Sequence, residues 1–220
     1  MELSSLQKIQ TQIQACKKTQ QKNVQVIAVS KKQSLEKMRS LYSEGQRLFA
    51  ENYVQEALLK QNQLKDLDIE WHFIGHLQSN KVKNVVGQFD LLHSIDSLKL
   101  IETIHKIAKE KNLIQKILLQ VNFSQESTKE GMDASEVLPI LDKIHHYSHV
   151  QIQGLMTMPP LVDNPEDNRI YFQKAQSLLI QTPWTELSMG TSHDYLVAVE
   201  EGATLIRLGT ILFGERNSKK

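Results

Sequence analysis

The sequence predicts an α/β fold, a single-domain (β/α)₈ TIM barrel. Eight short apolar segments alternate with segments of helical period along the 220 residues. Short strands that are nearly all apolar and separated by helices are typical of a parallel sheet covered by helices. Eight such units suit a closed barrel, whose size range begins at about 200 residues. An open doubly wound sheet is the alternative, but its first turn more often carries a glycine-rich phosphate loop, and the turn Ser30–Lys37, SKKQSLEK, contains no glycine.

Each strand is expected at a run of apolar residues that ends in polar or small residues. The first run is representative, because four consecutive apolar residues in VQVIAVS precede a serine and two lysines. The eight predicted strands are Val24–Ser30, Arg47–Glu51, Ile69–Gly75, Phe89–Ile95, Lys116–Asn122, Val150–Thr157, Thr185–Gly190 and Thr204–Thr210.

Helices are expected between the strands, where apolar residues recur at helical spacing. The clearest are Leu35–Gly45, Tyr53–Leu64, Ser97–Asn112 and Ala134–Ser148. Ser34, Asp96 and Ser192 are expected to cap helix starts, and Gly45 and Gly202 to follow helix ends.

The N-terminal residues 1–20 are predicted to form an amphipathic helix that packs on the barrel and covers the gap left by a short eighth helix. No change of composition and no Pro/Ser-rich linker divides the chain, so residues 1–220 are expected to form one domain. The apolar face of the N-terminal helix comprises Leu6, Ile9, Ile13 and Cys16.

The charge balance and the cysteine content argue against several classes of protein. The 26 basic and 25 acidic side chains give a formal net charge of +1, so the basic footprint of a nucleic-acid or acidic-membrane binder is missing. Cys16 is the single cysteine, which excludes an intrachain disulfide and a cysteine-based zinc site and suits a reducing compartment. No run resembles a signal peptide or approaches the roughly 20 apolar residues of a membrane span. We therefore expect a soluble cytoplasmic protein, and no metal-binding motif appears.

Barrels of this type carry their chemistry at the C-terminal ends of the strands, and the first strand here ends in two lysines. Lys31 and Lys32 are either ordinary solvated charges or include an amine at the mouth of a site. Because successive side chains of a strand point to opposite faces, only one of the two could reach the barrel axis. The spacing leaves open which one does.

Small residues end strands seven and eight, where barrels often bind phosphate. Backbone N–H groups and hydroxyls would be available there, together with the N-terminus of a helix beginning near Ser192. The alternative is that these residues only form tight turns. The candidate phosphate cup consists of Ser188, Gly190, Ser192, Gly209 and Thr210.

Arg207 lies between apolar residues of the eighth strand, and a guanidinium is costly to bury without an acceptor. A salt bridge to a structural carboxylate is one interpretation. The other is a fixed donor that points toward a ring nitrogen or a carboxylate in the barrel mouth. A lysine opposite a phosphate cup is the arrangement that holds a phosphorylated aldehyde as a Schiff base.

Other strand ends carry further polar candidates. His72 could line the pocket or be a hydrogen-bonded core residue. The remaining candidates are Glu51, Asn52, His93, Ser94, Asn122, Met156 and Thr157.

Several motifs, in this order and spacing, resemble the pyridoxal phosphate homeostasis proteins, the YggS/PROSC-type family, over essentially the whole chain. They are AVSK (Ala28–Lys31), ENYVQE (Glu51–Glu56), WHFIGHLQSNK (Trp71–Lys81), HSID (His93–Asp96), VN (Val121–Asn122), ESTKEG (Glu126–Gly131), GLMT (Gly154–Thr157) and the long segment Leu187–Arg216. Two positions depart from the family pattern: Ala50 replaces a glycine, and Thr191 replaces the second methionine of SMGMS.

The resemblance implies a barrel of the alanine racemase N-terminal domain type that holds pyridoxal 5′-phosphate (PLP) as a covalent imine to Lys31, with Lys32 a surface neighbour. It implies an arginine facing the pyridine nitrogen, Arg207, and pocket residues Asn52 and His72. The phosphate would be bound by Ser188, Gly190, Gly209 and Thr210.

An arginine opposite the pyridine nitrogen weakens the case for an enzyme. A guanidinium stays protonated and cannot accept a proton, so the ring nitrogen would be neutral and the cofactor a weaker electron sink. Racemases and decarboxylases of this fold also add a β-domain, for which we expect no room after the eighth strand, and no catalytic residue is assigned.

The leading hypothesis is a PLP-binding protein of intracellular vitamin B6 and amino-acid homeostasis, without clear catalytic activity. Apo PLP-dependent enzymes are its expected recipients, and the resemblance suggests a monomer or weak dimer. The alternative is a monomeric PLP-dependent amino-acid racemase or lyase, which predicts α-proton exchange in deuterated water. A sugar-phosphate-binding barrel, with Lys31 a simple charge, predicts a colourless protein.

Overall fold

The computed structural model describes residues 3–16, 23–124 and 130–214. Residues 1–2 and 17–20 of the expected N-terminal helix, most of the motif Glu126–Gly131 and the last two residues of the segment Leu187–Arg216 lie outside these ranges. Within them, eight parallel strands form a closed barrel in which neighbours in sequence pair and β8 pairs with β1. The predicted α/β class and closed (β/α)₈ barrel are therefore confirmed. The strands are β1 Gln25–Val29, β2 Leu48–Glu51, β3 Glu70–Phe73, β4 Leu91–Ile95, β5 Gln115–Gln120, β6 Val150–Met156, β7 Glu186–Thr191 and β8 Leu205–Leu208.

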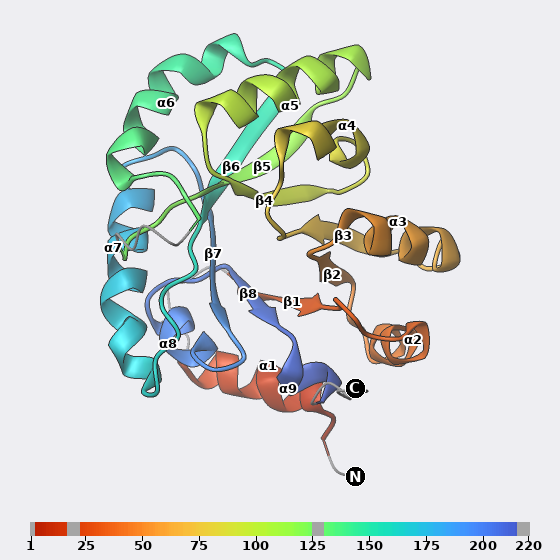
Figure 1. Ribbon diagram of the computed structural model, residues 1–220. Coiled ribbons are helices and arrows are strands. Elements are labelled where there is room, and N and C mark those ends of the chain that lie inside the picture. The colour runs from red at the N-terminus through yellow and green to blue at the C-terminus, as the bar shows by residue number, and fades with distance from the viewer. Residues whose placement is uncertain (1–2, 17–22, 125–129, 215–220) are drawn as a thin grey trace.

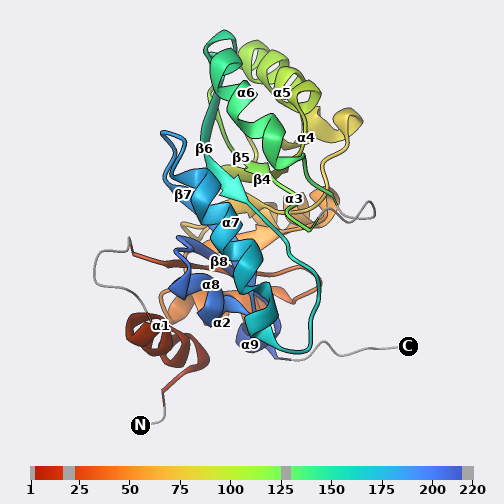
Figure 2. The same ribbon diagram turned by 90° about the vertical axis from the view of Figure 1, so that its left-hand side faces the viewer.

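Helices surround the strands, and Figures 1 and 2 show them as an outer layer around the barrel. Their apolar faces and the outward-facing strand residues form the main hydrophobic core. The α-helices are α1 Ser5–Cys16, α2 Leu35–Ser43, α3 Val54–Gln63, α4 Val82–Val85, α5 Leu98–Glu110, α6 Val137–Lys143, α7 Arg169–Leu179, α8 Tyr195–Glu200 and α9 Thr210–Phe213. In the described ranges, 3₁₀ turns lie at Ser79–Lys81, Ala134–Glu136, Ile144–His146 and Pro165–Asn168.

The N-terminal helix α1 contacts α8 and α9, beside which it lies in Figure 1. Its buried residues Leu6, Ile9 and Ile13 are three of the four that the helical spacing predicted. The Tyr195 hydroxyl of α8 donates a hydrogen bond of 2.6 Å to Gln12 Oε1. No helix in the described part of the chain is both long and apolar enough to cross a bilayer.

The interior of the barrel contains a small apolar cluster and a buried polar layer. Side chains two apart on a strand share a face, so His93 lies on the same face as Leu91 of the cluster, and Arg207 on the same face as Leu205. His72 also faces inward, because it pairs in register with Ala50 of the cluster. The apolar cluster comprises Ile27, Ala50, Leu91, Leu118, Met156 and Leu205.

The predicted helix boundaries were partly wrong. Ser34 caps α2 and accepts a hydrogen bond from Lys37 N, as predicted. The cap of α5 is Ser97 rather than Asp96, because the Ser97 hydroxyl accepts from Leu100 N. The eighth helix begins at Tyr195 rather than near Ser192.

Two glycines end helices as predicted. Gly45 follows α2 with φ +104° and Gly202 follows α8 with φ +99°, values that glycine adopts without strain.

Candidate functional site

Barrel closure places the ends of β7, β8 and β1 side by side. Ile27 of β1 pairs in register with Arg207 of β8, and Arg207 also pairs with Thr191 of β7. A Cβ atom built on Gly209 would lie 3.8 Å from Val29 Cβ. The turn that carries Lys31 is therefore beside the end of β8, whereas the sequence suggested that it lay opposite.

Lys31 and Lys32 lie in a turn after β1, which ends at Val29. We expected the alternation of strand side chains to send the two lysines to opposite faces. That expectation was wrong, because neither lysine lies within the strand. Lys31 is half-buried and Lys32 is exposed. Lys32 has a positive φ of 59°, and its N–H donates 2.6 Å to Glu56 Oε1.

A buried ammonium group supports this turn from outside the barrel. Lys60 of α3 is 6% exposed, and its Nζ donates to the Ser30 carbonyl at 2.6 Å, to Glu51 Oε1 at 2.8 Å and to Glu56 Oε1 at 2.7 Å. Burial raises the pKa of the Glu51 carboxyl, and the hydrogen bonds from Lys60 and Ser30 oppose this effect only in part. Glu51 and Glu56 therefore connect both sides of the Lys31 turn to α3.

Sequence reasoning gave Lys60 and Glu56 no role. The available signal was their spacing of four residues on one helix, which places the two side chains on the same face.

Arg207 is 3% exposed inside the barrel. Its Nη1 donates to Ser188 Oγ at 2.6 Å and its Nη2 to the Thr157 carbonyl at 2.9 Å. Among the described residues no carboxylate forms an ion pair with it, so the salt-bridge interpretation was wrong. Burial lowers the pKa of Arg207 to about 10, and the charge of Asp194 acts in the opposite direction.

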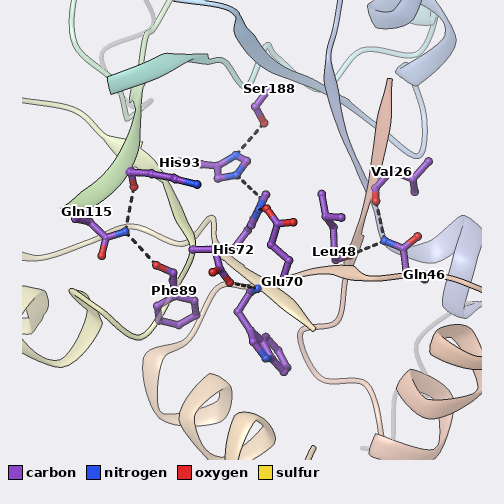
Figure 3. Close-up of polar contacts among 12 residues, drawn as sticks. Val26, Gln46, Leu48, Glu70, His72, Phe89, His93, Gln115 and Ser188 are labelled. Atoms are coloured by element: carbon purple, nitrogen blue, oxygen red, sulfur yellow. Dashed lines mark hydrogen bonds and ion pairs between the residues drawn. The ribbon is translucent and has the colours of Figure 1, made fainter. Parts of the chain in front are cut away.

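Ser188 and His72 lie below the barrel mouth, within its polar interior. Ser188 is fully buried and hydrogen-bonds to His93 Nδ1 at 2.9 Å, while His93 Nε2 lies 3.0 Å from His72 Nδ1. Figure 3 shows these side chains in one continuous row. His72 is therefore a hydrogen-bonded core residue, and the position of Ser188 favours contact with Arg207 over contact with a ligand phosphate.

The end of β7 and the turn after it are compact. Gly190 has φ +86°, and a Cβ atom on it would lie 2.6 Å from Ala198 Cβ. Asp194 Oδ1 accepts from Thr191 N at 2.7 Å. The next strand end is tied to this turn, because Gly209 N–H donates to Ser192 Oγ at 3.2 Å and Thr210 begins α9 directly afterwards.

A cavity of about 310 Å³ opens at the mouth near the ends of β3, β5 and β6. Asn52 lines it, and the Asn52 Oδ1 atom is buried without a hydrogen-bond partner among the described residues. Gly75 permits this position of Asn52, since a Cβ atom on Gly75 would lie 2.0 Å from the Asn52 carbonyl oxygen. Asn52 is the predicted cofactor residue that lines this cavity, whereas Lys31, Gly190, Gly209 and Thr210 are not among its lining residues.

Residues 4–217 match the family model of the alanine racemase N-terminal domain. The chain is 44% identical over 197 residues to the pyridoxal phosphate homeostasis protein of Aquifex aeolicus, covering 87% of this chain and 86% of that protein. It is 40% identical to PipY of Synechococcus elongatus, whose structure with PLP bound superposes with a TM-score of 0.82 over 94% of this chain and 100% of PipY. An alanine racemase from Clostridium difficile is 14% identical, with a TM-score of 0.75 over 95% of this chain and 56% of the racemase, a likeness of fold alone.

Proposed function

This chain belongs to the pyridoxal phosphate homeostasis protein family, and we propose that it binds PLP through a Schiff base between Lys31 and the cofactor aldehyde. The observation that carries the proposal is the buried guanidinium of Arg207, which is held by neutral acceptors and lies on β8, the strand that pairs with β1 and so with the strand leading into the Lys31 turn. A fixed donor next to an amine suits a ligand with a ring nitrogen and an aldehyde. The PLP-bound structure of PipY, at 40% identity, supports the same assignment.

The groups at the mouth fit this cofactor. Asn52 Oδ1 is a buried acceptor that lacks a partner among the described residues, so a bound donor would satisfy it. Gly209 packs loosely against the end of β1, since a Cβ atom built on it would be in ordinary van der Waals contact with Val29 at 3.8 Å. We assign Gly190, Gly209 and Thr210 to the phosphate, and Arg207 to the pyridine nitrogen. Ser188 and His72 support Arg207 from below.

The same geometry favours holding PLP over using it for catalysis. Bound PLP supplies an aldehyde for the imine and a ring that withdraws electrons most strongly when its nitrogen is protonated. A guanidinium has only donors and does not accept that proton. Arg207 would therefore keep the ring nitrogen neutral, and the imine would serve mainly to retain the cofactor.

We further propose that the protein stores PLP in the cytoplasm and releases it to apo-enzymes, which would affect vitamin B6 and amino-acid balance. Reversible imine formation at a half-buried lysine suits such release. The measurement is the rate at which an apo-enzyme acquires PLP from the loaded protein. A rate equal to that of unassisted release into buffer would argue against direct delivery.

Lys31→Ala is expected to lose the yellow imine band and to leave no PLP attached after borohydride reduction. Lys32→Ala is the matched control, because it removes an exposed lysine from the same turn and should retain both signals. Visible absorbance and the mass of the reduced protein measure these outcomes. A band that follows Lys32, or a colourless wild-type protein, would overturn the site assignment.

A further inference from the structure

A row of hydrogen-bonded side chains runs from one end of the barrel interior to Arg207. Glu70 Oε1 lies 3.0 Å from His72 Nε2, His72 Nδ1 lies 3.0 Å from His93 Nε2, His93 Nδ1 lies 2.9 Å from Ser188 Oγ, and Arg207 Nη1 donates to that oxygen at 2.6 Å. Figure 3 shows the row from Glu70 to Ser188. Glu70, the first residue of β3, has a side chain that is 49% exposed, whereas the other four residues are at most 3% exposed.

With both histidines neutral, the two ends of the row determine the direction of every hydrogen bond. Arg207 has only donors, and an ionised Glu70 has only acceptors. Glu70 therefore accepts from His72 Nε2–H, which leaves Nδ1 of a neutral His72 to accept from His93 Nε2–H. A neutral His93 then accepts from the Ser188 hydroxyl at Nδ1, and Ser188 Oγ accepts from Arg207. Each of the other four residues donates one hydrogen bond toward Glu70.

The competing arrangement places a proton on both nitrogens of His72. His93 would then have to accept at Nε2 and donate from Nδ1 to Ser188. Ser188 Oγ would accept twice, from His93 and Arg207, and its own proton would have no acceptor among the described residues. A second buried cation would also lie close to Arg207, which costs free energy in a medium of low dielectric constant.

The surroundings agree with a neutral His93. Burial lowers the pKa of His93 well below its usual range, and the charge of Arg207 acts in the same direction. At the other end, the hydrogen bond from His72 is the largest of the effects that lower the pKa of Glu70. Asp194 is the acidic group that acts on Arg207 from the mouth.

We propose that Glu70, His72, His93 and Ser188 are positioning residues that fix the Arg207 guanidinium and transmit the charge of Glu70 to it through the barrel. The row gives a buried cation a distant counter-charge without placing a carboxylate beside the cofactor. It makes the electrostatic environment of the cofactor ring depend on a carboxylate at the opposite, N-terminal end of the barrel. The effect of the Glu70 charge on bound PLP rests on the proposed function, whereas the hydrogen-bond directions in the row do not.

The hydrogen-bond directions are tested by ¹⁵N NMR of histidine side chains in the PLP-free protein, assigned with His72→Gln and His93→Gln. We expect His72 and His93 both to be neutral, with the proton on Nε2. An imidazolium at His72, or a proton on Nδ1 of either ring, would overturn the proposal. Because no PLP is present, this result is independent of whether Lys31 forms an imine.

The transmission is tested with Glu70→Gln in the PLP-loaded protein. Glutamine keeps an acceptor for His72 but removes the charge, so the protonated imine loses stabilisation and the pH at which its absorbance titrates should fall. Glu186→Gln is the matched control, since Glu186 begins β7 at the same end of the barrel and binds Thr204 outside the row. A larger downward shift for Glu70→Gln supports the proposal, whereas equal shifts or no shift would refute it.

Discussion

Replacing Lys60 with methionine is expected to lower the free energy of unfolding by about 3–5 kcal/mol, the usual cost of removing one partner from a buried ion pair. Methionine has a similar length but no donor. The Ser30 carbonyl and the Glu51 and Glu56 carboxylates would each lose a hydrogen bond of 2.6 to 2.8 Å. Urea denaturation at neutral pH measures the change.

Lys65→Met is the matched control, because it makes the same replacement at an exposed lysine just beyond α3. It should change stability by no more than about 0.5 kcal/mol. Adding Glu51→Gln to Lys60→Met should recover part of the loss, since an amide is less costly to bury unpaired than a carboxylate. A Lys60→Met protein as stable as the Lys65→Met protein would show that the buried cluster contributes nothing.

The loss caused by Lys60→Met should also depend on pH. The Glu51 pKa is already raised by burial, and Lys60 is the main group that lowers it. Without Lys60, folded Glu51 binds its proton at higher pH than unfolded Glu51 does. Between those two pKa values the native state holds more protons, so the stability of the variant rises relative to wild type as pH falls. The difference between the two proteins should therefore shrink from pH 7 toward pH 5, measured by urea denaturation at each pH.

Gly154→Ala is expected to destabilise the barrel by more than about 4 kcal/mol, beyond the range of most single substitutions. Gly154 of β6 pairs with Glu186 of β7, and a Cβ atom on it would lie 1.7 Å from the Glu186 carbonyl oxygen and 2.5 Å from its carbon. Both atoms belong to the backbone of a paired strand. The clash can be relieved only by separating two strands of a closed sheet, since no flexible side chain can move aside.

Gly45→Ala separates this clash from the general cost of replacing a glycine. Gly45 has φ +104° but no atom within 4 Å of a built Cβ, so only backbone strain of about 1–3 kcal/mol is expected. Thermal unfolding followed by circular dichroism compares the two variants. Equal melting temperatures would contradict the prediction, because they would mean that β6 and β7 can move apart to accommodate the Cβ atom at little cost.

The periodicity of the sequence was sufficient for the architecture. Each predicted strand contains the observed one or overlaps most of it. Parallel strands are buried on both faces, so a short apolar run marks the position of each strand in the sequence. The errors lie at element ends. Asp96 and Ser97 can both cap a helix, and only the path of the chain after β4 decides that the Ser97 hydroxyl meets Leu100 N. Ser192 caps no helix because α8 begins only at Tyr195, and the Ser192 hydroxyl accepts from Gly209 N–H instead.

The residues of the candidate site could be predicted from the sequence, but their hydrogen-bond partners could not. Lys31, Arg207 and the small residues after β7 and β8 stand out because their residue types are unusual at those positions. The partners of Arg207 could not be read from the sequence, since Ser188 and Thr157 lie on other strands. Similarly, Lys60 is an ordinary helical lysine in sequence, and only the packing of α3 against the end of β1 brings it to the Ser30 carbonyl.

Residue patterns along the chain thus specify the eight strands, the barrel that they form and the amine after the first strand, because these depend on local periodicity and on strand order. The tertiary structure decides how the polar groups pair. Closing the barrel brings β8 against β1, which places Arg207 beside Ile27 and Gly209 beside Val29 at the end of β1. It also aligns Glu70, His72, His93 and Ser188 from three different strands in one row. Hydrogen bonds between distant segments depend on distances of a few tenths of an ångström that only the folded chain sets.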